Sequence, residues 1–456
     1  MAAYKRNSDR IIGKIIIRAS LKNESPLLIG KGAGESTDIE IMQLPDGRPY
    51  IPASSMAGCL KQFMIDHDMT SDHNYLWGRT GNEEKNPIQS HLRIDDLVPA
   101  SASISDISMR DGVKINHKTG TAEDAKKYDY HIVEPGLVFS FQSEITIRNG
   151  MNINEVTKFV SALRDVLRFS EFRIGALTNT GFGKFECLGF SAHQFKFPEN
   201  AEAWFQFIDS GNISLSEMKL AEVSTIQQPG SFSIEAIFKL KTSLIIGAYG
   251  VKSTEPDKSQ LKSRDRHVLP GKSIRGAIRH RAVKILNTLE IPNAESQANS
   301  LFGIVDEENG TKAQKGRLRV EEYIFKENEV EPMLQNRIRI DRFTGGVIDG
   351  ALFNSEPVWT KGQEAIKLTF TILKEALPEE KKLLLLLLKD LWLEDLAIGG
   401  EKNIGRGILI GQKAKVFNDG ELIAQFQRNG TSHELAFTVG DAAAINSLFE
   451  VETSAS

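Results

Sequence analysis

Residues 268–281 read VLPGKSIRGAIRHR, and this stretch determines how the rest of the chain is interpreted. Its Pro-Gly pair favours a tight turn, and apolar residues from Ile274 onward recur at the spacing of an amphipathic helix. Cations at a helix N-terminus oppose the helix dipole, so Lys272 and Arg275 are poor choices for stability alone. A helix start with open N–H groups, a serine hydroxyl and basic side chains instead suits a bound phosphate.

Two nucleotide-binding motifs are excluded at this point. Gly271-Lys272-Ser273 matches the end of the phosphate-binding loop GxxxxGK[ST], but the first glycine of that motif would fall at Arg266. A dinucleotide-binding fold is excluded because no GxGxxG opens a helix in either glycine loop of the chain.

The same turn occurs a second time about 218 residues earlier, where residues 50–61 read YIPASSMAGCLK. Three further motif pairs follow in the same order at an offset of about 225 residues: LWG at 76–78 with LFG at 301–303, VKINHKTG at 113–120 with IRIDRFTG at 338–345, and GFGK at 181–184 with GRGI at 405–408. Motifs in one order at nearly constant spacing indicate a tandem duplication.

Composition is that of a globular protein with two domains. The chain has 456 residues, of which 40% are hydrophobic and 25% charged. Cys59 and Cys187 form no metal-binding or disulfide pattern, which fits a reducing cytoplasm. The strongest apolar run, residues 383–388, is far too short for a membrane span. The net charge is −4, but residues 258–286 hold nine Lys or Arg against one acid, which indicates a polyanionic partner.

Each copy has the order strand, polar loop, helix, hairpin, strand, helix, glycine loop, strand. This split βαβ order predicts an α+β fold of two tandem ferredoxin-like or RRM-like domains with protruding β-hairpins. We place the first domain at residues 1–190 and the second at 231–456. Residues 191–230 have no matching segment in the second half and are interpreted as a linker with some local structure.

The two glycine loops have two explanations. A single glycine loop is often just a tight turn with positive φ. Here both loops carry a basic residue and both are expected near a basic helix start, which favours backbone amides that approach a phosphate chain. The residues concerned are Gly181, Gly183 and Lys184 in the first copy and Gly405, Arg406 and Gly407 in the second.

The ordered motifs resemble the RAMP superfamily of CRISPR–Cas proteins, and more narrowly the repeated backbone subunit of type III effector complexes. The resemblance covers both halves and misses mainly residues 191–230. The second copy is closer to the family pattern, because the first has Ala53 in place of glycine and Asn116-His117 in place of Asp-Arg. Two fused copies resemble the tandem backbone proteins of subtype III-D-like systems.

The resemblance implies an RRM-like fold that grips the phosphates of a guide RNA, with thumb-like hairpins that intrude between nucleotides. The implied guide-binding residues at the helix starts are Ser54, Ser55 and Lys61 in the first copy and Lys272, Ser273, Arg275 and Arg279 in the second. The implied thumb residues are Lys118, Thr119 and Gly120, with Arg342, Phe343 and Thr344.

The resemblance further implies cleavage of guide-complementary target RNA by an aspartate in the loop before the basic turn. Asp38 and Asp257 lie 14 and 13 residues before the turn proline and are the candidate catalytic and metal-binding residues; Glu40 and Glu255 are the alternatives. The expected cofactor is Mg²⁺ or another divalent cation. The expected partners are a guide RNA, a complementary target RNA and other type III subunits, and the second possible function is a non-catalytic backbone that only binds guide.

Overall fold

The structure, a computed structural model, describes residues 10–32, 37–69, 74–78, 87–116, 119–222, 226, 230–249, 255–304, 313–361, 365–430 and 435–446. The chain forms two compact units. The first unit comprises Met1–Met109, Asp129–Thr178 and Phe182–Gln227, and the second comprises Arg110–Tyr128, Asn179–Gly181 and Gln228–Ser456.

The first unit is built on an antiparallel sheet whose long central strand is β1 (Ile11–Asn23). β1 pairs on one side with β8 (Val138–Arg148) and on the other with β9 (Phe185–Lys196), and β4 (Leu92–Ile94) extends the sheet beyond β8. The order β4-β8-β1-β9 is the one that a split βαβ fold produces, with the first strand between the last two.

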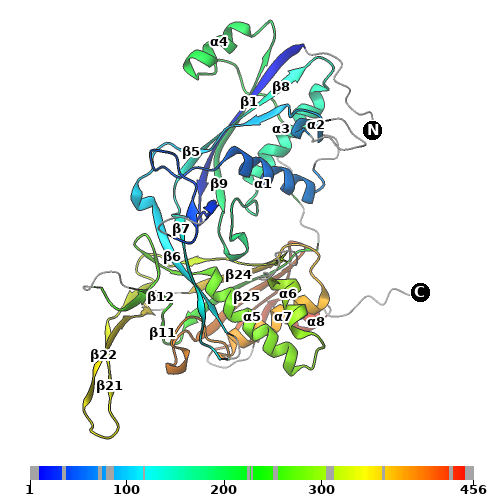
Figure 1. The fold of residues 1–456 in the computed structure, drawn as a ribbon. Coiled ribbons are helices and arrows are strands. Elements are labelled where there is room, and N and C mark those ends of the chain that lie inside the picture. Colours follow the sequence, from blue (N-terminus) through cyan, green and yellow to red (C-terminus); the bar gives the residue numbers. More distant parts are fainter. Residues whose placement is uncertain are drawn as a thin grey trace. The chain divides into compact units, whose positions relative to one another are not determined.

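Two helices cover this sheet on one face (Figure 1). α1 (Ala53–Asp66) buries Met56, Leu60 and Met64, which recur every four residues and therefore lie on one side of the helix. α3 (Ile153–Arg168) starts at Asn152, whose side chain accepts a hydrogen bond from the Asn154 N–H at 3.0 Å and so caps the helix.

The second unit repeats this architecture and adds two strands. Its sheet has the antiparallel order β18 (Leu318–Val320), β24 (Ile366–Ile372), β10 (Phe232–Leu240), β25 (Leu409–Asn418), β26 (Glu421–Arg428), β27 (Leu435–Val439). The first four strands match those of the first unit one for one. The predicted pair of tandem ferredoxin-like domains is confirmed.

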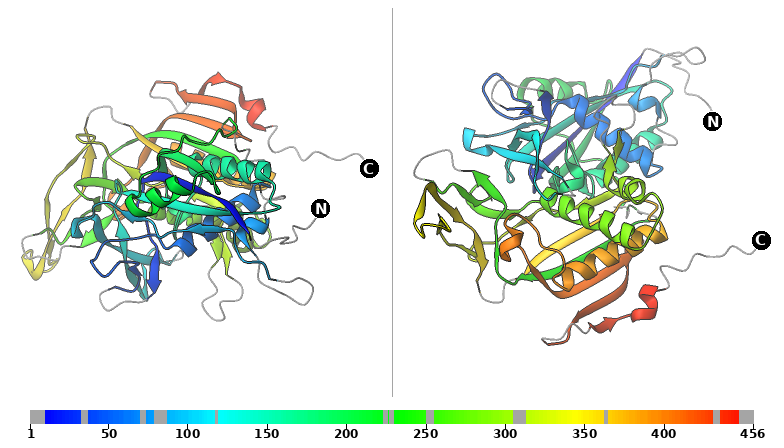
Figure 2. Two further views of the ribbon diagram at one scale, coloured as in Figure 1. Left: turned by 90° about the horizontal axis from the view of Figure 1, so that it is seen from above. Right: turned by 60° about the horizontal axis from the view of Figure 1, so that its bottom comes forward.

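Three helices pack beside the second sheet, as the right-hand view of Figure 2 shows: α5 (Gly271–Thr288), α6 (Ala294–Phe302) and α7 (Pro378–Trp392). α5 begins at Gly271, directly after Pro270, so the helix starts about three residues earlier than the apolar spacing from Ile274 predicts and Gly271 lies in its first turn. The leucine run lies in α7, where Leu383, Leu384, Leu387 and Leu388 are buried in the core.

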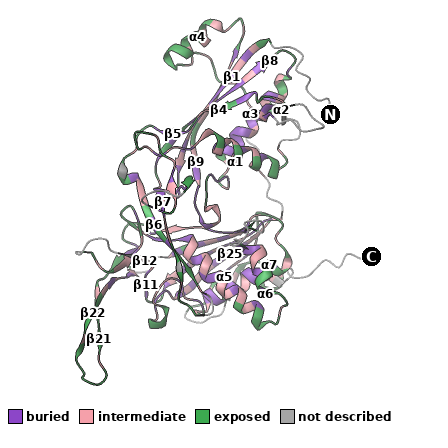
Figure 3. Ribbon diagram, in the orientation of Figure 1, coloured by how far each residue is buried: buried purple, intermediate pink, exposed green. Residues whose placement is uncertain are grey.

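Each repeat carries a β-hairpin between its first helix and its third core strand. The first hairpin is β6 (Ile107–Ile115) and β7 (Ala122–Val133), and the second is β21 (Gln335–Ile340) and β22 (Val347–Glu356). The second hairpin extends away from the sheet of its unit and is mostly exposed (Figure 3).

The outer part of the first hairpin belongs to the second unit. There, Arg110 on β6 forms an ion pair with Glu322 at 2.6 Å, and both side chains are only 2% exposed. The Arg110 side chain is therefore part of the interior of the second unit, although most of the hairpin segment that carries it is exposed.

Residues 191–230, interpreted as a linker from the sequence, contain the end of β9 and the helix α4 (Ala201–Ser210). Trp204 of α4 packs edge-on against Phe195 of β9, with ring centroids 5.1 Å apart. This segment is held to the sheet by aromatic contacts, which the strand-to-strand repeat of the sequence does not reveal.

The remaining elements are short. They are β2 (Gly30–Gly32), β3 (Glu40–Ile41), α2 (Asn74–Trp77), β5 (Val98–Pro99), η1 (Ile104–Asp106), η2 (Thr178–Thr180), β11 (Ser243–Leu244), β12 (Gly247–Tyr249), β13 (Lys258–Gln260), β14 (Lys262–Ser263), β15 (Arg266–Leu269), β16 (Gly303–Ile304), β17 (Gln314–Lys315), β19 (Tyr323–Ile324), β20 (Val330–Pro332), β23 (Val358–Thr360), η3 (Lys402–Ile404) and α8 (Ala442–Asn446). None of the helices in the described part of the chain has the length and apolar character needed to cross a lipid bilayer.

Candidate functional site

Asp38, the candidate catalytic residue of the first repeat, is joined to Asp129 on β7 by a reciprocal pair of hydrogen bonds, which we call the clamp. The Asp38 N–H donates to Asp129 Oδ1 at 2.9 Å, and the Asp129 N–H donates to Asp38 Oδ2 at 2.9 Å. The next residue, Ile39, forms a parallel bridge with Tyr130. The loop that carries Asp38 is therefore laid along the strand that leaves the first hairpin.

Asp257 has the same arrangement in the second repeat. Its N–H donates to Asn354 Oδ1 at 2.7 Å, and the Asn354 N–H donates to Asp257 Oδ2 at 2.9 Å. The following residue, Lys258 of β13, pairs in parallel with Ser355 of β22. The clamp is thus duplicated together with the fold.

Neither clamp partner was predicted from the sequence. Asp129 follows Asp38 by 91 residues and Asn354 follows Asp257 by 97, so no local pattern links them. A signal did exist, because Asp129 and Asn354 are separated by the same offset of about 225 residues as the other repeat motifs.

Each clamp leaves one carboxylate oxygen of the aspartate available. Asp38 and Asp257 are exposed, and within the described residues Oδ1 of each has no hydrogen-bond partner. Carboxylate and amide oxygens are the donors that Mg²⁺ prefers, and this ion commonly uses one or two carboxylates and completes its shell with water and phosphate. The residues present fit such an ion, although no cluster of three or more His, Cys, Asp or Glu occurs in the described residues.

The alternative acids differ from the aspartates. Glu40 forms an ion pair with Lys31 at 2.5 Å, and the matching position in the second repeat is Ser259. Glu255 is exposed, and the matching position in the first repeat lies outside the described residues. Among these four acids of the described residues, Asp38 and Asp257 are the pair that has the same hydrogen bonds in both repeats.

The start of α1 already has an anionic partner. The Ala53 N–H donates to Asp96 Oδ1 at 2.7 Å, so this carboxylate occupies part of the helix N-terminus. Ser54 is exposed, whereas Ser55 and Lys61 are half-buried. Ser54 is therefore the most accessible of the three predicted RNA-binding residues of this helix.

The start of α5 is more enclosed. Lys272 contacts the hydroxyl of Tyr128 and lies over its ring, 4.1 Å from the centroid. Burial lowers the pKa of Lys272 to about 8, because the charged amine loses water that the aromatic ring replaces only in part. The neighbouring Ser273 is half-buried, and its N–H donates to the Pro270 carbonyl.

The two arginines of α5 are engaged by protein groups. Arg275 donates to the carbonyls of Phe302 and Leu318, and burial lowers its pKa to about 10, with a smaller effect from nearby Arg279. Arg279 donates to Asn299 Oδ1. Because Phe302 ends α6, Arg275 satisfies a carbonyl that its own helix leaves without a partner. Both arginines thus hold α6, and their predicted RNA contact stays a prediction.

The glycine loops are shaped by contacts within the protein. Gly183 and Gly407 are buried with φ of 75° and 74°, and an added Cβ would lie 2.1 Å from the Ile174 carbonyl oxygen and 1.8 Å from that of Ile398. Gly181 is enclosed as well, whereas Gly405 has open space around it. The tight-turn explanation therefore accounts for Gly183 and Gly407 without a ligand.

The basic residues of the two loops differ in their environment. Lys184 pairs with Glu24 at 2.8 Å near the surface. Arg406 is buried, pairs with Glu401 at 2.8 Å and donates to Ser243 Oγ at 2.9 Å. Lys184 is thus more accessible to an RNA phosphate than Arg406.

The hairpin tips are accessible. Arg342, Phe343 and Thr344 are exposed, and the N–H groups of the last two donate to the Asp341 carboxylate at 2.7 and 2.9 Å. These bonds lower the pKa of Asp341. Thr119 and Gly120 are exposed at the first tip, where the Thr119 N–H donates to Asn116 Oδ1 in the same way. Lys118 lies outside the described residues.

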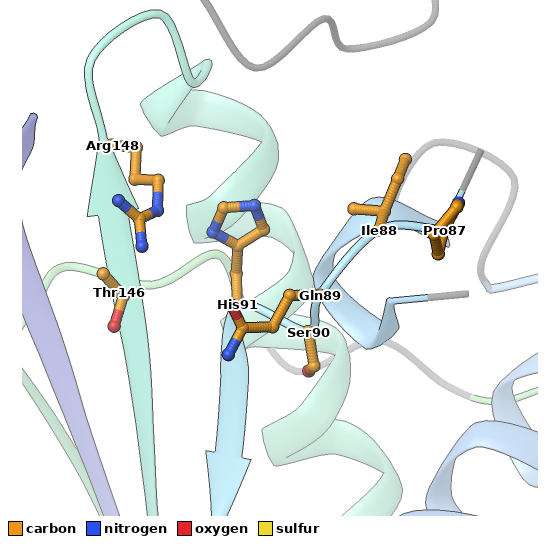
Figure 4. Close-up of a pocket in the computed structure, with 7 residues that line it drawn as sticks. All are labelled: Pro87, Ile88, Gln89, Ser90, His91, Thr146 and Arg148. Atoms are coloured by element: carbon orange, nitrogen blue, oxygen red, sulfur yellow. The ribbon is translucent and has the colours of Figure 1, made fainter. Parts of the chain in front are cut away.

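Two cavities occur elsewhere in the units. A pocket of about 200 Å³ in the first unit is lined by Thr146 and Arg148 of β8 and by the segment that leads into β4, with Pro87, Ile88, Gln89, Ser90 and His91 (Figure 4). A groove of about 520 Å³ in the second unit runs along α5 from Ala277 to Thr288 and reaches Leu396 and Lys402. Neither cavity contains a predicted catalytic or RNA-binding residue.

Comparison with protein families finds a match that covers both repeats. A family model described as the RAMP superfamily matches residues 20–186 and 237–410. Both clamps, both helix starts, both hairpin tips and both glycine loops fall inside the matched regions. No curated protein matches the chain.

Proposed function

Because the chain belongs to the RAMP superfamily, whose members bind RNA within multi-subunit CRISPR–Cas complexes, we propose that it is a guide-binding backbone subunit of a type III effector complex that cleaves target RNA. The chain supplies two consecutive backbone units, each with one cleavage site. The duplicated clamp on Asp38 and Asp257 carries the proposal, because it gives both repeats the same exposed, oriented carboxylate.

Guide binding is assigned to the accessible polar and basic groups. Ser54 at the start of α1, Lys184 in the first glycine loop and the exposed hairpin tips offer donors to phosphates without first breaking an internal contact of the core. The buried Arg275 and Arg406 instead hold the elements that present these groups. This division separates the residues that bind RNA from those that shape the surface.

Cleavage is assigned to the aspartates. Oδ1 of Asp38 or Asp257 holds a divalent ion or orients the attacking 2′-hydroxyl of the target, while Oδ2 stays fixed by the clamp. A bound Mg²⁺ supplies stabilisation of the charge that develops at the scissile phosphate. Two equivalent aspartates on one chain produce two cuts in one target.

The test uses the assembled complex with its guide, a labelled complementary RNA and Mg²⁺. Asp38→Ala and Asp257→Ala should each remove one discrete product and leave guide binding unchanged. Asp209→Ala, which alters an exposed aspartate of α4, is the matched control and should cut at both positions. An unchanged product ladder in both clamp variants would instead identify the chain as a non-catalytic backbone.

A further inference from the structure

The partners of the two aspartates have a role of their own. We propose that Asp129 and Asn354 are positioning residues for cleavage, each of which fixes the orientation of the aspartate opposite it. The inference rests on the proposed function, because it takes Asp38 and Asp257 as the groups that act on target RNA. It adds two residues that touch neither RNA nor metal and that act through the aspartate of their own repeat.

The geometry of the clamp restrains the aspartate at two points. The backbone N–H of Asp38 and its Oδ2 are both bonded to Asp129, at 2.9 Å each, so the two bonds close a ring through the side chain. Rotation about either side-chain bond would break this ring. The remaining oxygen, Oδ1, is therefore presented in one direction, which is the condition for an effective reacting group.

The clamp is not needed to attach the loop to the hairpin. In the first repeat, the Ile39 N–H donates to the Asp129 carbonyl at 3.3 Å, and the His131 N–H donates to the Ile39 carbonyl at 2.9 Å. In the second repeat, β13 and β22 pair through Lys258–Ser355 and Ser259–Glu356. Backbone bonds thus already hold each loop in place, and the side-chain bonds add a fixed orientation of the aspartate.

The two repeats share an acceptor and differ in charge. Asp129 offers a carboxylate oxygen and Asn354 an amide oxygen, yet both accept from the backbone N–H of the aspartate opposite, at 2.9 and 2.7 Å. In both repeats the acceptor is therefore the side-chain Oδ1 of the partner residue. The negative charge of Asp129 is therefore dispensable for positioning, and the two partners should be interchangeable.

The test compares single-turnover rates of the two cuts in the assembled complex. Asp129→Ala should slow the first cut about tenfold or more and leave the second cut at the wild-type rate. The apparent affinity for target RNA should not change, because the partner does not contact RNA. Asp129→Asn, which copies the second repeat, should restore the first cut to near the wild-type rate.

The second repeat gives an independent version of the same comparison. Asn354→Ala should slow only the second cut, and Asn354→Asp should cut normally. The thermal unfolding midpoint and the guide affinity of every variant should match those of the wild type, which separates positioning from loss of fold. If one alanine variant does not assemble, the other repeat still decides the question.

Asp38→Asn separates failure of this inference from failure of the proposed function. An asparagine keeps an oxygen for the Asp129 N–H but removes the charge, so the first cut should disappear. If Asp38→Asn and Asp257→Asn both cut normally, the proposed catalytic function is wrong, and the positioning role is wrong with it. If they abolish cleavage while Asp129→Ala and Asn354→Ala cut at the wild-type rate, only the positioning role is wrong. Equal defects in the Ala and Asn variants of Asp129 would also overturn it.

Discussion

At the scale of single residues, the structure explains why cations occur at a helix start that disfavours them. Arg275 reaches the carbonyl of Phe302 at the end of α6, so it compensates a neighbouring helix end. A sequence pattern shows that cations cluster at this turn but not what they meet, because their partners lie in segments distant along the chain. Arg275 therefore does not support a phosphate at this turn, and the proposed guide binding rests on accessible residues elsewhere, such as Ser54 and Lys184.

Lys272 provides a prediction about pH. Its pKa of about 8 lies below the ordinary lysine value of 10.5, so the folded state binds fewer protons than the unfolded state between these pH values. Stability should therefore rise with pH across this window, and below about pH 8 the buried charge lowers it by a constant amount.

The variant Lys272→Met removes this charge. It should raise the free energy of unfolding by roughly 1 kcal/mol at pH 7, and the gain should shrink as the pH approaches 10.5. Urea denaturation of both proteins at pH 7 and pH 10 measures the difference. An equal gain at both pH values would contradict the expected cause.

At the scale of elements, the sequence predicted much of the fold. The repeat defined which segments are equivalent, and hydrophobic spacing located the main helices and the first strand of each copy. The contact between Asp38 and Asp129 was not predicted from the sequence. Asp129 lies within a strand, and no residue beside it indicates that Asp38 is its partner. The aromatic contact of α4 with β9 was not predicted either, because residues 191–230 have no counterpart in the second repeat that would mark the segment as structured.

The glycine loops give a prediction at this scale. Gly407→Ala places a methyl group 1.8 Å from the Ile398 carbonyl oxygen, which is a severe steric clash. The variant should therefore lose roughly 3 kcal/mol or more of stability. Gly405→Ala is the matched control two residues away. Its φ is 84° but no atom lies within 4 Å of the added Cβ, so it should cost about 1–2 kcal/mol. Thermal unfolding of the two variants measures this ranking, and equal losses would show that backbone conformation alone requires both glycines.

At the scale of the whole molecule, the duplication extends from the sheets to individual hydrogen bonds. The four-strand order, the hairpin position and the aspartate clamp all recur. The hairpins differ in their surroundings. The outer part of the first is incorporated in the second unit through Arg110 and Glu322, whereas the second hairpin exposes Phe343 at its tip, with 98% of its surface accessible.

The Arg110–Glu322 pair gives a prediction about stability. Arg110→Ala leaves Glu322 buried without its main partner and should cost about 3–5 kcal/mol. The double variant Arg110→Met with Glu322→Leu removes both charges and should recover most of that loss. Denaturation of Arg110→Met, Glu322→Leu and the double variant, combined in a thermodynamic cycle, tests the coupling. Additive losses would mean that the two side chains do not depend on each other.

The same pair has a consequence for the order in which the protein forms during synthesis. Arg110 leaves the ribosome 212 residues before Glu322 does, which corresponds to a delay of about 10–40 s at ordinary rates of translation. Throughout this interval the nascent hairpin carries a charged side chain whose buried destination does not yet exist. The first half of the chain must therefore keep the Arg110 side chain in water until the second half emerges, so docking of the hairpin is a late event that reports arrival of the second repeat.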